Sequence, residues 1–96
     1  MRKREAEQIN AVIHRFLREE GLETPYNEYR LVQAWPEVMG QGIANYTGNL
    51  EIRNRVLYVR LKSSVLRQEL SMNRRVLVHK LNEHVGAQVI ENIVFH

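Results

Sequence analysis

The first half of the chain has the hydrophobic pattern of amphipathic helices. In residues 4–20 the apolar side chains recur every three or four positions, as on one helical face; they are Ile9, Val12, Ile13, Phe16 and Leu17. Gly21 follows and suits a helix end. After a linker, Leu22 to Pro25, the pattern predicts a second helix from Asn27 to Trp35. Because proline is tolerated in a first helical turn, we expect a third short helix from Pro36 to Tyr46, in which Gly40 and Gly42 permit close packing.

From Leu50 onward the hydrophobic period shortens to two, which is typical of a half-buried strand. Leu57, Val59 and Leu61 alternate with Tyr58, Arg60 and Lys62. The first set should enter the core while the second faces outward. The pattern predicts a hairpin whose strands run from Leu50 to Arg53 and from Val56 to Lys62, with Asn54 adopting the positive φ of a tight turn.

The last third of the chain predicts one long helix and a final strand. Ser63 or Ser64 suits the helix N-cap, and the helix should continue to about Val85 and end at Gly86. Its core stripe comprises Leu66, Leu70, Leu77 and Leu81. The residues from Val89 to Phe95 are rich in the β-branched and aromatic types that favour strands.

The predicted order is α-α-α-β-β-α-β, an α+β fold in which N-terminal helices precede a β-β-α-β unit and a three-stranded sheet packs on helices. The chain has 96 residues, enough for one modest core. We expect a disordered N-terminus at residues 1–4 and a single domain over residues 5–96.

Composition supports a folded protein in the cytoplasm. Hydrophobic residues make up 44% of the chain and charged residues 26%, which is typical of globular domains. No apolar run approaches the roughly 18 residues that cross a bilayer, and no signal peptide precedes the first helix. The absence of cysteine excludes disulfides and thiolate chemistry. We therefore expect no membrane association.

Charge is distributed unevenly. The net charge is only +3, yet residues 53–80 contain eight Lys or Arg residues and the single acid Glu69. Such a one-sided segment is suited to a polyanion, because neutralising phosphates releases condensed counterions. The alternative is a solvated face that is balanced by acids brought near it in the fold.

Residue types that support catalysis are missing. None of the four histidines pairs at the i, i+4 spacing of a helical metal site, and the chain has no Asp. Ser63-Ser64 lacks the glycines of a nucleophile elbow, and Gly40-Gln41-Gly42 lacks the lysine of a phosphate loop. We expect no enzyme activity, cofactor, metal or small-molecule substrate.

Binding residues concentrate in the basic segment. Tyr58, Arg60 and Lys62 combine an aromatic ring with cations on one strand face, an arrangement that holds single-stranded nucleic acid. Tyr58 is equally open to interpretation as a sheet residue lying against a neighbouring side chain, whereas Trp35 is interpreted as a core anchor. The candidate nucleic-acid-binding residues are Arg53, Arg55, Tyr58, Arg60, Lys62, Arg67, Arg74 and Arg75.

The order and spacing of several short motifs resemble the bacterial DciA-like family over roughly residues 5–95. The motifs are Trp35-Pro36-Glu37-Val38-Met39-Gly40, Ile43-Ala44, Tyr46-Thr47, the Leu57-x-Val59-x-Leu61 strand, Ser63-Ser64, Gln68-Glu69-Leu70, Leu81-Asn82, Gly86 and Ile93-x-Phe95. The resemblance implies a KH-like domain that binds DNA, in proteins that act on the replicative helicase as loaders or operators. Leu66 stands where the family commonly has Trp, and the GxxG loop of true KH domains is missing.

Together these observations predict a DNA-binding accessory protein of bacterial DNA replication that acts with the replicative helicase. DNA, single-stranded or duplex, and the helicase are the expected partners. One alternative is a protein-interaction module, in which the first helix and the Trp35 region dock on a partner without direct nucleic-acid binding. The other is an RNA-binding KH-like domain, since stacking and phosphate contacts serve both nucleic acids.

Overall fold

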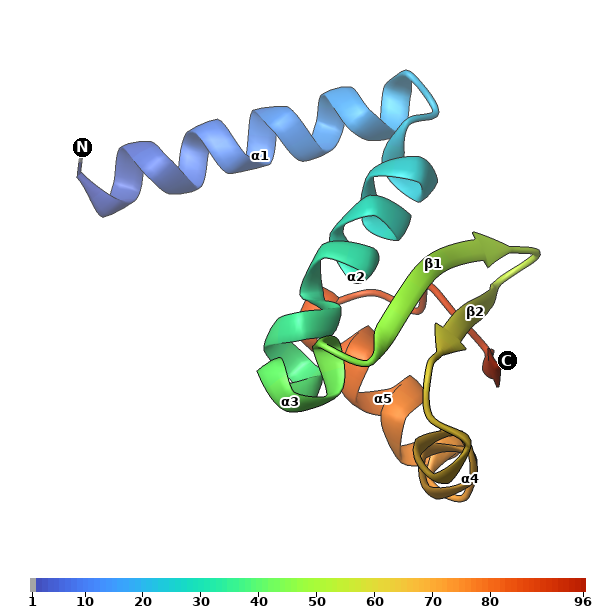
Figure 1. Cartoon of the computed structure of the whole chain (residues 1–96). Coiled ribbons are helices and arrows are strands. Elements are labelled where there is room, and N and C mark those ends of the chain that lie inside the picture. Colours follow the sequence, from blue (N-terminus) through green and yellow to red (C-terminus); the bar gives the residue numbers. More distant parts are fainter. Residues whose placement is uncertain (1) are drawn as a thin grey trace.

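The structure, a computed structural model, describes residues 2–96 and is an α+β fold (Figure 1). Its elements are α1 (Lys3–Glu19), α2 (Glu23–Met39), α3 (Gln41–Ala44), β1 (Thr47–Arg53), β2 (Val56–Leu61), α4 (Ser64–Ser71), α5 (Arg74–Val85) and β3 (Asn92–Phe95). The predicted class, with N-terminal helices followed by a three-stranded sheet and its helices, is confirmed. The predicted disordered segment, residues 1–4, includes Met1, which lies outside the described residues.

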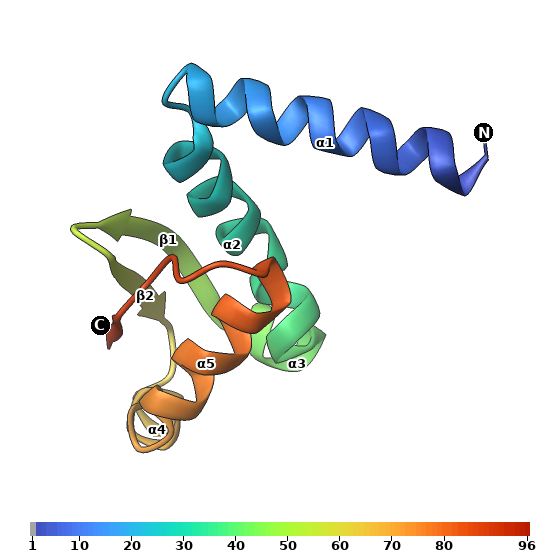
Figure 2. The same cartoon turned by 180° about the vertical axis from the view of Figure 1, so that it is seen from behind.

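The sheet has the order β1-β2-β3, with β2 at its centre. β1 pairs with β2 antiparallel, and β3 pairs with β2 parallel. The predicted alternation in β2 is confirmed, since Leu57, Val59 and Leu61 are at most 2% exposed. α2 and α5 pack against each other beneath the inner face of the sheet (Figures 1 and 2), and the core forms between these layers.

The predicted hairpin is also confirmed. Its two turn residues, Asn54 and Arg55, have φ values of 50° and 65°. Two consecutive residues with positive φ characterise the type I′ turn, whose twist matches that of the flanking strands. Asn adopts this conformation readily, whereas Arg55 does so without the freedom of glycine.

Two helix boundaries were predicted wrongly in the N-terminal half. α2 begins at Glu23 and passes through Pro36 without interruption, so the predicted linker and the bend at Pro36 are absent. Pro25 falls in the first turn, where its missing N–H costs nothing. Beyond Pro36 the helix continues because Val38 and Met39 still pack on the core.

α2 ends at Gly40, whose φ of 88° is accessible mainly to glycine. The predicted close packing at Gly40 and Gly42 is wrong, since no heavy atom lies within 4 Å of a Cβ placed at either position. Gly40 therefore serves the backbone turn between α2 and the short helix α3, and not a close approach of two elements.

The predicted single helix from Ser63 or Ser64 to Val85 is divided into α4 and α5. Ser63 caps α4 as predicted, its Oγ accepting a hydrogen bond from the backbone N–H of Leu66 at 3.2 Å. The break falls at Asn73, whose side-chain Nδ2 donates to the carbonyl of Glu69 at 3.2 Å. Asn side chains compete with the backbone for such hydrogen bonds, so a helix can be interrupted without Gly or Pro.

β3 is shorter than predicted because the residues before it are held by a buried side chain. Asn82 is 4% exposed, and its Nδ2 donates to the carbonyl of Ile90 at 2.8 Å. Its Oδ1 accepts from the backbone N–H groups of Val89 and Ile90 at 3.0 and 3.1 Å. Val89 and Ile90 are buried in this loop, so the predicted strand Val89 to Phe95 pairs only from Asn92 onward.

Trp35 is the core anchor that the sequence predicts. It is 1% exposed, and its ring centroid lies 6.4 Å from that of Phe95. The indole N–H donates to Thr47 Oγ1 at 3.0 Å, and this hydroxyl donates in turn to the carbonyl of Ile43 at 2.9 Å. Trp35 thus joins α2 to the start of β1.

α1 forms as predicted but extends away from the rest of the molecule (Figures 1 and 2). None of its residues is buried. The Cα radius of gyration is 15.3 Å, whereas a compact domain of this length has a value of about 12.5 Å. Most of the apolar face of α1 is therefore left uncovered by the remainder of the chain, and Leu17 near its C-terminal end is half-buried.

Candidate nucleic-acid interface

The outer face of the sheet is centred on β2. Tyr58 and Arg60 lie on the opposite side of this strand from the core residues, Tyr58 half-buried and Arg60 exposed. Tyr58 pairs across the sheet with Glu51 of β1 and Val94 of β3. A tyrosine and an arginine two residues apart therefore share an open strand face, as the alternation predicts.

Arg53 covers the ring of Tyr58. Its guanidinium carbon lies 4.3 Å from the ring centroid, a cation–π contact, and its Nε lies 3.3 Å from Glu51 Oε1. This contact matches one of the two interpretations of Tyr58, that of a sheet residue lying against a neighbouring side chain. A base can stack on a guanidinium plane as well as on an aromatic ring, so both side chains of the pair are suited to contact a base.

Arg60 lies against Gly48 of the neighbouring strand. A Cβ placed at Gly48 would lie 3.5 Å from Arg60 Cβ and 3.6 Å from its Cγ and Cδ. The absence of a side chain at Gly48 therefore lets the aliphatic part of Arg60 rest on β1. Lys62 follows the end of β2, where its backbone N–H donates to the carbonyl of Tyr46 at 2.9 Å and its side chain is exposed.

Two of the candidate arginines have structural partners. Arg67 Nη1 donates to the carbonyl of Leu61 at 2.7 Å, which ties α4 to the end of β2. Arg55 Nε lies 3.0 Å from Glu91 Oε1. The backbone carbonyl of Arg55 accepts a hydrogen bond from the Glu91 N–H at 2.7 Å. Arg55 thus joins the hairpin turn to the loop before β3.

Arg74 and Arg75 occupy the first turn of α5. No acidic residue lies in that turn, and Asn73 makes no side-chain cap. Cations near a helix N-terminus are unfavourable because they face the positive end of the helix dipole. In Figure 1 the β1–β2 turn lies at one end of β2, and α4 and α5 lie beyond the other end. The arginines of the turn and those of α5 therefore lie on opposite sides of β2 along its length.

Glu51 and Glu91 are the site residues that the charge pattern did not reveal. They lie outside residues 53–80, and each pairs with an arginine of that segment. The acids brought near the basic face by the fold thus neutralise part of its charge. Within residues 2–96 no acidic side chain forms a salt bridge with four of the candidates, Arg60, Lys62, Arg74 and Arg75. Strand alternation places Glu51 on the same face as Arg53, two residues along β1, whereas nothing local in the sequence identifies Glu91.

Two of the histidines, both on α5, make polar side-chain contacts away from β2. His84 of α5 lies 3.1 Å from Glu37 of α2, and His79 lies 3.0 Å from Glu83 on the same helix. Across residues 2–96, no three His, Asp or Glu side chains cluster closely enough to hold a metal ion. The helices in the described part of the chain are also too short or too polar to span a bilayer.

Comparison with known protein families decides the assignment. The family model described as "Dna[CI] antecedent, DciA" matches residues 8–95. The chain belongs to the DciA family. The resemblance carried by the Trp35-to-Gly40 run and the later motifs is thereby confirmed. A search of curated proteins found no match.

Membership of the DciA family implies a role in DNA replication together with the helicase. Leu66, at which the resemblance implied a Trp, packs on the core beside the buried residues. Leu at this position therefore contributes to the packing of α4.

Proposed function

We propose that the protein is a non-enzymatic accessory factor of bacterial DNA replication that binds DNA through the outer face of β2 and the basic residues at both ends of this strand. The observation that carries the proposal is the Arg53–Tyr58 stack beside Arg60 on an open strand face. The stack offers a guanidinium and an aromatic ring to a base, and Arg60, Lys62, Arg74 and Arg75 supply charge for phosphates. Acting with the replicative helicase, the protein would work in the cytoplasm.

Fluorescence anisotropy with a labelled single-stranded oligonucleotide tests the proposal. We expect binding at low salt that weakens steeply as salt is raised. The variant Arg60→Glu with Lys62→Glu should lose most of this affinity without unfolding, since both side chains are exposed. A matched control is Arg15→Glu with Arg18→Glu, which makes the same charge change on α1.

The result that overturns the proposal is equal loss of affinity in both double variants, or no binding by the full chain at low salt. Duplex DNA and RNA of the same sequence complete the titration. Tighter binding of RNA would favour the RNA-binding alternative, because stacking and phosphate contacts do not by themselves distinguish the two nucleic acids.

The alternative of a protein-interaction module is favoured by a separate observation, the uncovered apolar face of α1. Trp35 does not contribute to such a surface, because it is 1% exposed. Copurification of the replicative helicase with the Arg60→Glu, Lys62→Glu variant separates the two functions. Retention of helicase by a variant that no longer binds DNA would assign the helicase contact to another surface.

A further inference from the structure

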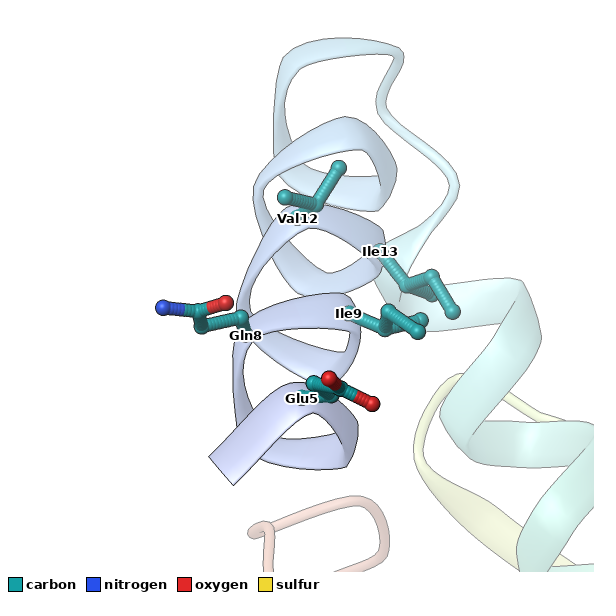
Figure 3. A pocket seen from close by; sticks show the side chains of 5 residues that line it. All are labelled: Glu5, Gln8, Ile9, Val12 and Ile13. Carbon is teal, nitrogen blue, oxygen red and sulfur yellow. The ribbon is translucent and has the colours of Figure 1, made fainter. Parts of the chain in front are cut away.

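The apolar face of α1 is exposed to solvent over most of its length. Ile9 and Ile13 are 44% and 45% exposed, and Val12 and Phe16 are each 54% exposed. In Figure 3 Ile9 and Ile13 extend from the same side of α1 and Gln8 from the opposite side, around a shallow hollow that Glu5 and Val12 complete. An amphipathic helix takes most of its stability from packing its apolar face. Most of the apolar face of α1 therefore has no packing partner within the chain.

The spacing of residues along this face is the same when it is counted from either end. The two end residues carry opposite charges. Arg2, Ile9, Ile13 and Glu20 follow one another at intervals of seven, four and seven residues. Both intervals are close to a whole number of turns, so Ile9 and Ile13 lie on one side of the helix. Arg2 and Glu20, the residues that cap the two ends of α1, lie near the same side. Their common midpoint is Ala11, which is also the midpoint of α1, Lys3–Glu19.

We propose that α1 pairs antiparallel with α1 of a second copy of this chain, about a two-fold axis at Ala11. In this pairing Ile9 packs against Ile13 of the second copy, and Phe16 packs opposite the small side chain of Ala6. Arg2 of each chain lies opposite Glu20 of the other. A parallel pairing places Arg2 opposite Arg2 and Glu20 opposite Glu20, so the charges select the antiparallel arrangement.

The size of the contact sets the expected strength. A helix of 17 residues is ~25 Å long and ~10 Å wide, so each face covers roughly 250 Å² and the two faces together roughly 500 Å², below the size of stable specific interfaces. We therefore expect a weak dimer that forms only toward the upper end of the micromolar range. The remaining outward side chains of α1, including Arg15 and Arg18, stay in solvent.

Sedimentation velocity of the full chain without DNA, from roughly 1 to 500 µM, measures this association directly. We expect a shift from monomer to dimer with rising concentration. Ile13→Asp should remain monomeric throughout, because it places a charge at the centre of the pairing. Val65→Asp, at a position 67% exposed on α4, is the matched control and should dimerise like the unchanged chain.

Charge exchange tests the antiparallel arrangement. Arg2→Glu alone and Glu20→Arg alone should each weaken the dimer roughly 5- to 30-fold at low salt, since each turns two attractive pairs into repulsive ones. An equimolar mixture of the two variants should restore dimerisation, because the mixed dimer has an attractive pair at each end. Both substitutions favour α1 itself through the helix dipole, so fraying of the helix does not explain a loss.

Several results overturn the proposal. These are a full chain that stays monomeric at the highest concentration, a dimer that survives Ile13→Asp, and single charge variants that are not rescued by mixing. A monomeric chain whose helicase binding is lost in Ile13→Asp would assign the apolar face to that partner. Far-ultraviolet circular dichroism of each variant confirms that the domain is folded.

Discussion

The guanidinium of Arg53 lies 4.3 Å from the centroid of the Tyr58 ring, on the outer face of a sheet whose inner face forms the core. The contact joins the last residue of β1 to the middle of β2. It holds a flexible cation over a ring, so part of the ordering that a stacked ligand requires is present before binding. Arg60, two residues along β2, supplies charge beside it.

The Arg53–Tyr58 stack predicts different results for two substitutions of Tyr58. Tyr58→Ala should weaken single-stranded DNA binding by about 1–3 kcal/mol, the usual contribution of one stacked base. Tyr58→Phe keeps the ring and should change affinity little. Anisotropy titrations of both variants measure the difference. Equal affinity of Tyr58→Ala and the unchanged chain would remove Tyr58 from the interface.

Salt dependence reports how many phosphates the surface contacts. If Arg60, Lys62, Arg74 and Arg75 each neutralise one phosphate, log K against log salt concentration should have a slope of about −3 for single-stranded DNA. Arg74→Gln with Arg75→Gln should reduce that slope by about half. An unchanged slope would show that α5 lies outside the contact and that β2 acts alone.

The two glutamates paired with arginines predict a gain of affinity. Glu91→Gln removes the carboxylate that lies 3.0 Å from Arg55, and Glu51→Gln does the same for Arg53. Each change also removes a negative charge that repels phosphate, so binding should tighten a few-fold at low salt. Glu83→Gln, which also removes an exposed acid but lies beside His79, is the control and should have a smaller effect.

Substitution of the buried Asn82 should cause a large loss of stability. Asn82→Ala leaves the N–H groups of Val89 and Ile90 and the carbonyl of Ile90 without their buried partner. Each unsatisfied group costs about 1–3 kcal/mol, partly recovered if water enters. We expect a loss of about 3 kcal/mol in the free energy of unfolding, measured by urea denaturation. His79→Ala, exposed on the same helix, should change it by less than ~0.5 kcal/mol.

Hydrophobic periodicity was sufficient to predict the elements that have one apolar face. The exposure pattern of Leu57, Val59 and Leu61 and the helicity of residues 4–19 both follow from it. Local chemistry added the Ser63 cap and the positive φ of Asn54. These features are predictable because they depend on residues close together in the sequence.

Packing on the core decided one of the remaining boundaries, and side-chain hydrogen bonds decided the other two. Pro36 does not end α2, since Val38 and Met39 pack on the core beyond it. Asn73 divides the predicted long helix through a side-chain hydrogen bond to Glu69, and Asn82 keeps Val89 and Ile90 out of the sheet. In each case one specific contact outweighs a weak local preference.

The sequence by itself therefore determined the α+β class, the hairpin, the basic segment and the family to which the chain belongs. Only the tertiary structure decided that Arg53 stacks on Tyr58, that Glu51 and Glu91 neutralise two of the arginines, and that the apolar face of α1 lies open. The physical reason is that periodicity reports which face of an element is apolar, whereas the side chain that contacts a given charge or face depends on how the side chains and elements are arranged in space.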